Sequence, residues 1–425
     1  MIKALLHAES ITIEKLLQAA SEESSRLKLY KIDEKIERAR YHALSSEYYP
    51  TLGVSYNTEY NRDENGLPFG TESVGDTVIT SGTRYQSSLS LNMNYELYHF
   101  GTTIKSREIA EREVKLKYLL WCEEEKKLYQ SILERYNSAL KMKIQSDLKQ
   151  KMLEVRQDLY EIKKRLYRAG RSSKVDLGDE AIFIIDLERD IEQAKMQYQD
   201  DIVNLSALSH IDLDEEHSVL LEIGYQQTDV LVDDFEETTE GYRYTQLIHQ
   251  KEEAISQYRR TQFPTISMYG NYYFYGSDPD DAYDSFDAIH KNSWKLGVAI
   301  RISLFEGFKY DKESDRLDLE LQRVKQEREL RKREYEYDAK SKANKIIHLV
   351  ALQHKDERLY NEAQEKIKMI DRLRNSYQVD SVSELTTKLE GYERELNLKI
   401  EMSETAYENA SLHILYRGVD QCTQH

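Results

Sequence analysis

The sequence contains little proline, and the positions of the few prolines indicate where long helices can lie. It has only four prolines, Pro50, Pro68, Pro264 and Pro279. None occurs between residues 102 and 263 or from residue 308 to the end. Because proline breaks helices, these two stretches permit helices much longer than those of a globular domain.

Cysteine and histidine are also too sparse to suggest a catalytic or metal centre. Cys122 and Cys422 form no CxxC pair, and the eleven histidines include no pair three or four residues apart. The chain has no phosphate-binding glycine loop and no GxSxG motif. Cys122 follows Trp121 inside a helical pattern, where we expect it to be packed rather than reactive. We predict no enzyme activity, no cofactor and no metal site.

The chain lacks a long apolar run and a basic block. No segment approaches the roughly 18 to 20 apolar residues of a transmembrane helix, so any membrane is not crossed by helices. With a formal charge of -17 and no Lys/Arg-rich block, the chain is a poor candidate for binding nucleic acid. The start, "MIKALLHAES", resembles the last part of a secretory signal. Either a signal has been trimmed or the start is cytoplasmic.

The proline-free stretches carry helical periodicity. From residue 102 to 168 apolar residues recur every three or four positions, at Leu133, Tyr136, Leu140, Ile144, Leu148, Met152, Val155, Leu159, Ile162 and Leu166. They form one face of a helix on the order of 100 Å long. The pattern stops at "YRAGRSSKVDLGDEA", where Gly170 permits a left-handed turn and Asp176 can cap a helix. It resumes from Ile184 to Leu205, which predicts a hairpin of two long helices.

The whole scheme then repeats at a spacing of about 206 to 214 residues. "YYPTLGVSYNTEY" is matched by "QFPTISMYGNYYFYG", and "YQSSLSLNMNYELYHFG" by the stretch from Trp294. We predict a first repeat at 10–212 and a second at 241–417, each a helix, a strand pair and a long helical hairpin. The strands are expected near 48–62 and 84–98, then 263–276 and 293–305, and the hairpin tips at 170–177 and 378–386. The acidic stretch 213–240 is interpreted as a connector rather than a core element, and 418–425 as a tail.

The predicted strands alternate apolar with polar residues. In "YQSSLSLNMNYELYHFG" the odd positions include Leu89, Leu91, Met93 and Tyr95, and the even positions are polar. The second copy does the same with Leu296, Val298, Ile300 and Ile302. Period two is the pattern of a strand with two unlike faces. For one such strand, a soluble sheet with one buried face is the simpler explanation.

Four matched strands favour a membrane, and the residues predicted to face lipid are Leu89, Leu91, Met93, Tyr95, Leu296, Val298, Ile300 and Ile302. Each strand spans roughly 10 to 14 residues, as a tilted membrane strand does, and aromatic residues gather at the strand ends. Four strands cannot close a barrel, and an open edge in lipid leaves backbone groups unpaired. The strands therefore require several chains around one barrel. The competing hypothesis is a soluble coiled-coil scaffold with a small β-domain, which explains the helices and the charge but not the alternation.

These parts together resemble the TolC-like outer-membrane efflux channel family, the outer membrane factors. The resemblance rests on two strand pairs between long helices, "FG" or "EGF" after the second strand, and a glycine turn at the hairpin tip. It runs from "SITIEKLLQAASEES" to about Arg417. It implies a mainly α fold with membrane β structure, in which a homotrimer forms a twelve-stranded β-barrel continuous with a periplasmic α-helical barrel.

The resemblance also implies a location and partners. The protein would lie in the cell outer membrane with a long periplasmic extension, in contact with outer-membrane lipid. It would work with a periplasmic adaptor protein and an inner-membrane transporter in tripartite efflux or type I secretion. The channel would open by separation of the coils at the periplasmic tip.

By the same resemblance, the two hairpin tips are the adaptor-docking regions. The residues expected there are Gly170, Arg171, Ser172, Ser173, Val175 and Leu177 in the first tip, and Val379, Asp380 and Leu385 in the second. Asp380 departs from the family pattern, because glycine is usual at that place. Thr386 and Leu389 stand where some members carry aspartates, so the candidate acidic gate is Asp176, Asp179, Glu384 and Glu390. Each of these acids could instead lie on a solvated helix face.

Overall fold

A computed structural model describes residues 9–61, 84–214, 218–224, 234–278, 280–375 and 380–415. The chain divides into two compact units. The first is drawn from Met1–Asp33, Lys117–Thr245 and Gln326–His425, and the second from Glu34–Leu116 and Gln246–Lys325. Each unit therefore combines segments from both halves of the sequence, and each is described separately below.

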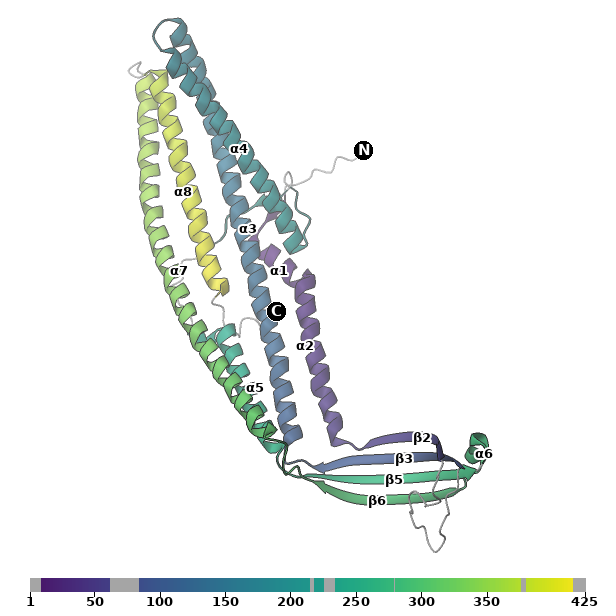
Figure 1. Cartoon of the computed structure of the whole chain (residues 1–425). Helices are drawn as coiled ribbons and strands as arrows, with labels where there is room; N and C mark the ends of the chain where they lie inside the picture. The colour runs from purple at the N-terminus through teal and green to yellow at the C-terminus, as the bar shows by residue number, and fades with distance from the viewer. Residues whose placement is uncertain are drawn as a thin grey trace. The chain divides into compact units, whose positions relative to one another are not determined.

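Two long helical hairpins form most of the first unit. In the first hairpin α3 (Thr102–Arg168) is followed by α4 (Lys174–Ser209), and in the second α7 (Lys309–Asn375) is followed by α8 (Ser381–Leu415). Figure 1 shows each shorter helix running back along its longer partner. Helices α3 and α7 have 67 residues each, which confirms the long helices predicted from the absence of proline.

The core of the first unit lies where the first hairpin meets the N-terminal segment. Strand β1 (Glu9–Ile11) precedes helix α1 (Ile13–Glu23), whose first turn is capped by Thr12. Helix α2 (Ser25–Ala43) follows. The buried side chains of this core are Ile11, Ile13, Leu16, Ala20, Ile132, Leu133, Tyr136, Ala139, Leu140, Tyr198, Ile202, Leu205, Leu213 and Ile223. The α3 members are residues of the predicted apolar face or their neighbours.

The segment interpreted as a connector contributes to this core, which corrects the sequence-based expectation. Strand β4 (Ser218–Leu220) pairs in parallel with β1, and the Tyr136 hydroxyl donates to the backbone oxygens of Ile11 and Leu221 at 2.8 and 2.6 Å. Short helix η2 (Phe235–Glu237) holds Phe235 at 1% exposure. These strands are three residues long, too short to show an alternating pattern.

The second unit is built around one antiparallel sheet. Its strands are β2 (Thr51–Asn61), β3 (Arg84–Tyr98), β5 (Thr265–Asp278) and β6 (Lys291–Arg301), in the order β2-β3-β5-β6. Figure 1 shows them side by side, with the short helix α6 (Ala282–Asp287) at one end. Pairing of β3 with β5 joins the strand pairs of the two repeats into a single sheet.

Helices and turns fix where the strands begin and end. The 3-10 helix η1 (Leu44–Tyr48) precedes β2 and includes Tyr48, where the first strand was predicted to begin. Helix α5 (Thr239–Arg260) precedes β5. Strand β6 ends at Arg301, so the predicted strand to residue 305 is too long and Ile302 lies beyond it. Gly101 and Gly307 have positive φ angles of 79° and 64°, which lets the chain turn sharply from β3 and β6 toward α3 and α7.

Over the residues that the structure describes, the helices contain no stretch that combines the length and the apolar character needed to cross a membrane.

Candidate membrane-facing surface and helical hairpin tips

One face of the sheet is apolar across all four strands. Paired residues of antiparallel strands share a face, so the register places Val54, Leu91, Tyr272 and Trp294 in one row. The apolar face comprises Leu52, Val54, Tyr56, Leu89, Leu91, Met93, Tyr95, Met268, Tyr272, Phe274, Trp294, Leu296, Val298 and Ile300. All the predicted lipid-facing residues belong to it except Ile302, which follows the end of β6.

This apolar face is exposed in the single chain. Val54, Val298 and Ile300 are 71%, 61% and 70% exposed, respectively. Monomeric soluble proteins rarely expose contiguous apolar patches of more than a few hundred Å². The face therefore needs an apolar environment that one copy of the chain does not supply.

The opposite face of the same sheet is polar. Its rows include Ser55, Asn57, Ser88, Ser90, Asn92, Asn94, Ser267, Tyr269, Asn271, Tyr273 and Lys295. The hydroxyls of Ser55 and Ser90 lie 2.7 Å apart, and the Asn92 amide donates to Ser55 at 3.3 Å. Hydroxyl and amide side chains that bond to one another across strands are suited to a water-filled space.

Helix α6 covers one end of the apolar face. The Ser285 hydroxyl lies 2.7 Å from the Ser87 hydroxyl, and the Phe286 ring meets the Tyr56 ring edge to face at 5.7 Å between centroids. Gly276 makes this approach possible, because a Cβ there would come within 2.5 Å of backbone atoms of Ser285 and Ala288. Small residues on β3 and β5 thus form the seat for α6.

The first hairpin tip is a tight turn stabilised by caps on both helices. Gly170 adopts a φ of 69°, and the Arg171 amide donates to the Leu166 carbonyl at 2.8 Å, which closes α3 in a Schellman-type turn. Ser173 caps α4 in a capping box with Asp176. The Ser173 backbone N–H, with the hydroxyls of Ser173 and Ser172, lowers the pKa of the Asp176 carboxyl.

Exposure differs among the predicted docking residues of this tip. Gly170, Arg171 and Ser173 are exposed, Ser172 and Leu177 are half-buried, and Val175 is 70% exposed. The structure thus brings the predicted residues together in one turn. Docking of an adaptor at this turn remains a prediction.

The second tip begins α8 with an aspartate in place of a glycine turn. Asp380 accepts a hydrogen bond from the Ser383 backbone N–H at 2.8 Å, which makes it the N-terminal cap of the helix. This hydrogen bond lowers the pKa of the Asp380 carboxyl. Leu385 is half-buried, and Val379 lies outside the described residues. The departure from glycine therefore has a local structural reason.

Each hairpin holds a buried glutamate between two cations in the part of the hairpin nearest its tip. Glu180 on α4 is 0% exposed and accepts from Arg156 Nη1 at 2.8 Å and Lys163 Nζ at 2.7 Å, both on α3. The sequence reasoning missed Glu180. The sequence feature that could have indicated such a site is the spacing of Arg156 and Lys163. This spacing puts two cations on one face of α3, two turns apart, where a single acid of a neighbouring helix can bind both.

Glu384, a predicted gate acid, occupies the corresponding kind of site in the second hairpin. It is 3% exposed and pairs with Arg374 Nη1 and Lys388 Nζ, each at 2.7 Å. Glu390 is exposed and pairs with Lys366 at 2.6 Å, and Asp179 is exposed on the first turns of α4. The four candidate gate acids therefore have different surroundings.

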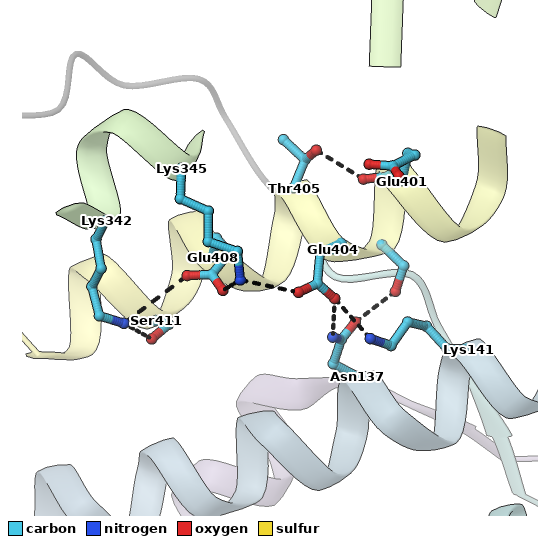
Figure 2. Close-up of polar contacts among 10 residues, drawn as sticks. Asn137, Lys141, Lys342, Lys345, Glu401, Glu404, Thr405, Glu408 and Ser411 are labelled. Atoms are coloured by element: carbon cyan, nitrogen blue, oxygen red, sulfur yellow. Dashed lines mark hydrogen bonds and ion pairs between the residues drawn. The ribbon is translucent and has the colours of Figure 1, made fainter. Parts of the chain in front are cut away.

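Farther along α8, a row of acids joins the helix to both long helices (Figure 2). Glu404 accepts from Lys141 of α3 at 2.7 Å and lies 3.5 Å from Lys345 of α7. Glu408 pairs with Lys345 at 2.5 Å, and Ser403 donates to Asn137 of α3 at 2.6 Å. This polar seam connects the two repeats within the first unit.

No metal centre is found in the part of the chain that the structure describes. It contains no group of three or more His, Cys, Asp or Glu side chains placed to hold a metal ion. Cys122 is fully buried in α3, as predicted from its position beside Trp121.

Comparison with known proteins shows which family and which solved structures this chain is similar to. The family model described as outer membrane efflux protein matches residues 16–209, most of the first repeat. This part of the chain is therefore similar to outer membrane efflux proteins. A comparison with curated proteins finds no match.

Solved structures show a similar fold over nearly the whole chain. The CmeC outer membrane channel of Campylobacter jejuni is 12% identical with a TM-score of 0.76, covering 95% of this chain and 85% of that one. VceC of Vibrio cholerae is 14% identical with a TM-score of 0.74, covering 96% of both chains. The open-state MtrE channel of Neisseria gonorrhoeae is 16% identical with a TM-score of 0.69, covering 98% and 94%.

Family and fold together confirm the resemblance read from the sequence. The family that matches residues 16–209 is one of outer membrane proteins. The fold of this chain is that of outer membrane channels with TolC-like architecture. The family is one of transport proteins, and the absence of catalysis remains a prediction for this chain.

Proposed function

We propose that this protein is the outer-membrane channel of a tripartite efflux or type I secretion system. Three copies would each contribute β2, β3, β5 and β6 to a twelve-stranded barrel, and their hairpins to a periplasmic tunnel. The two sequence repeats, 10–212 and 241–417, would supply equal shares of strands and helices to this assembly. Substrates would pass from an inner-membrane transporter and a periplasmic adaptor to the exterior.

The apolar face of the sheet is the observation that carries this proposal. It extends over four strands of 11 to 15 residues, and the reverse face is polar. Strands β2 and β6 are sheet edges in the single chain. Unpaired edge groups cost several kcal/mol each in lipid, so pairing β6 of one copy with β2 of the next satisfies the backbone. The soluble-scaffold alternative leaves the apolar face without a covering.

The hairpin tips are proposed as the adaptor-docking ends. The exposed Arg171 and Val175 offer one cation and one apolar contact beside the Gly170 turn, and Leu385 adds a second apolar contact from α8. The channel would open by separation of the hairpins at these tips, which is a rigid-body change that adaptor binding can bias.

Adjacent residues on β6 provide a matched test of the membrane assignment. Val298 lies on the apolar face and Ala299 on the polar face, in the row of Ser267 and Glu96. Val298→Lys should prevent assembly in the outer membrane, because a lysine on the lipid face of a barrel costs about 2 to 4 kcal/mol at the membrane midplane. Ala299→Lys should assemble as wild type does. The readout is the amount of detergent-resistant trimer in isolated outer membranes.

Two results would contradict the proposal. Equal assembly of the two variants would show that neither face meets lipid. A folded monomer of the wild-type protein that purifies without detergent would support the soluble scaffold instead.

A further inference from the structure

The apolar face of the sheet ends in a row of small and polar residues. Thr58, Ser87 and Gly276 pair across β2, β3 and β5, two positions beyond the apolar row that contains Leu89. This row lies at the end of the sheet away from α3, because α3 follows the opposite end of β3. It shares the face that we assign to lipid, where a hydroxyl without a hydrogen-bond partner costs free energy. The row therefore needs a cover if this face meets lipid.

Helix α6 provides that cover and satisfies the hydroxyls. The Ser285 hydroxyl donates to the Ala282 carbonyl at 2.7 Å, so it can accept from Ser87, whose oxygen lies 2.7 Å away. Ser87 in turn accepts from the hydroxyls of Tyr56 at 3.3 Å and Thr58 at 3.0 Å. A hydroxyl has one donor and two acceptor sites, so Ser87 is fully bonded, and it is only 1% exposed. The row is thus sealed by α6 with its hydrogen bonds satisfied.

The residues of α6 that the sheet does not cover are of two kinds. Tyr283 and Phe286 are 74% and 53% exposed. Asp284 and Asp287 are also exposed. Aromatic rings favour an apolar environment, whereas ionised carboxylates must stay in water, and the headgroup region of a membrane offers both. We propose that α6 is an interfacial helix that places Tyr283 and Phe286 among the lipid headgroups, an inference that rests on the proposed function.

The height of α6 on the sheet agrees with this assignment. On β5 the apolar face runs from Ile266, beside the end of β3, to Gly276, where α6 packs. These two residues are ten positions apart, which is about 33 Å along a strand at about 3.3 Å per residue. For a strand tilted by about 35 to 45°, this length spans about 25 Å, the height of the apolar band of a membrane barrel. Helix α6 thus lies at the boundary of the hydrocarbon, on the side away from the start of α3 and α7.

Lipid is a better partner for these rings than a neighbouring copy of the chain. Helix α6 bonds to Ser87 of β3 and packs against Gly276 of β5, and these are the two inner strands of the sheet. A neighbouring copy would join at the outer strands, β2 and β6. Because the Phe286 ring also contacts Tyr56 of β2, Tyr283 is the residue on which the test is made.

Tryptophan fluorescence of the full-length protein, reconstituted in phosphatidylcholine vesicles, tests this proposal. One set of vesicles carries bromine, a contact quencher, near the headgroup, and a second set carries it deep in the acyl chains. Tyr283→Trp is made in a Trp294→Phe background, and its emission is taken as the excess over that background. We expect bromine near the headgroup to remove about half of this emission, because one side of an interfacial ring meets lipid, and deep bromine to remove less.

Two positions on the sheet serve as controls. Trp294 lies on the apolar face, in the row of Tyr272, so the emission lost in Trp294→Phe should be quenched more by deep bromine than by bromine near the headgroup. Tyr269→Trp, on the polar face and in the same background, should not be quenched. If the emission of Trp294 is not quenched by either lipid, the proposed membrane assignment itself fails.

Two outcomes would overturn the inference while leaving the membrane assignment in place. One is quenching of Trp294 without quenching of Tyr283→Trp, which would place α6 in water or against another copy. The other is stronger quenching of Tyr283→Trp by deep bromine than by bromine near the headgroup. If Tyr283→Trp does not assemble, Phe286→Trp is judged by the same criteria.

Discussion

At the scale of single residues, two acids one turn apart on α8 have opposite electrostatic roles. Burial raises the pKa of Glu401, and the nearby carboxylates of Asp356 and Glu404 raise it further against the opposing effect of Lys141. Its Oε2 atom is buried and has no hydrogen-bond partner. Burial also acts to raise the pKa of Glu404, but Lys141, Lys345 and the hydrogen bond from Asn137 together outweigh burial, so this pKa is lowered.

These shifts predict stability changes of opposite sign. Glu401 has a folded-state pKa above its unfolded value, so its ionisation weakens the fold as pH rises from about 4.5. Glu401→Gln should therefore stabilise the protein at pH 7. Glu404 has a lowered folded-state pKa, so it stabilises the fold above its unfolded pKa and loses this effect as pH falls. Glu404→Gln should destabilise the protein at pH 7.

Thermal unfolding of both variants and the wild type between pH 4 and 8 measures this contrast. The two variants should lie on opposite sides of the wild type at neutral pH. Glu401→Gln should approach the wild type as pH falls toward 4, whereas Glu404→Gln should still be destabilised there, because the Glu404 carboxyl has a lowered pKa. The experiment is internally controlled, since both substitutions exchange the same atoms on the same helix. Shifts of the same sign at pH 7 would contradict the opposite effects on stability that we assign to the charges of Glu401 and Glu404 in Figure 2.

At the scale of elements, the seat of α6 depends on one glycine. Gly276→Ala would place a Cβ 2.5 Å from backbone atoms of Ser285 and Ala288, and backbone cannot move aside without displacing the helix. We expect α6 to loosen at a cost of about 1 to 3 kcal/mol, the usual range for overpacking. Hydrogen exchange of the peptide that covers residues 280–290 should become faster.

Gly53→Ala is the matched control for that variant. Gly53 lies on β2 of the same sheet, and an added Cβ there would meet no atom within 4 Å. Exchange at residues 280–290 should therefore stay at the wild-type rate. If both variants leave exchange unchanged, the close fit between Gly276 and α6 does not hold the helix in place.

The elements also show what sequence reasoning can and cannot reach. Long helices were predictable because apolar spacing at Leu133, Tyr136 and Leu140 persists without proline, and these side chains are buried in the core. Alternation in β3 likewise predicted the two faces of the sheet. The β1–β4 pair was not predictable, because three-residue strands carry no period and their pairing depends on tertiary contacts such as the Tyr136 hydroxyl.

The candidate site was predictable in part for a similar physical reason. Gly170 and Asp176 have local roles, a left-handed turn and a capping box, that follow from residues within four positions. Glu384 is different, because its burial and its pairing with Arg374 depend on how α7 and α8 meet. An acid on an amphipathic helix gives no sequence sign of which partner helix covers it.

At the scale of the whole molecule, the duplication gives each chain two sheet edges of unlike origin. Strand β2 comes from the first repeat and β6 from the second, while β3 and β5 join the repeats at the centre of the sheet. If β6 of one copy pairs with β2 of the next, a strand of the second repeat again lies beside a strand of the first repeat. The β3–β5 pair has this same arrangement within one chain. In this way one duplicated chain can close a ring with a single type of interface.

The proposed opening at the tips leads to a last prediction about the acidic gate. Asp176 is engaged in the capping box, Glu384 is balanced by Arg374 and Lys388, and Glu390 pairs with Lys366. Asp179 is exposed one turn beyond the cap, so its charge is best placed to act on passing ions. Asp179→Asn should lower the potassium-to-chloride permeability ratio, whereas Glu384→Gln should leave the ratio unchanged.

The Glu384→Gln variant distinguishes a role of Glu384 in gating ions from a role in holding α7 and α8 together. Glu384→Gln removes the carboxylate that holds Arg374 of α7 and Lys388 of α8, so this variant should loosen the contact between the two helices and speed hydrogen exchange at residues 381–390. If Glu384→Gln shifts the reversal potential and Asp179→Asn does not, the conducting path passes Glu384. The second hairpin would then open in the working channel, because only separation of α7 from α8 could expose that carboxylate to ions.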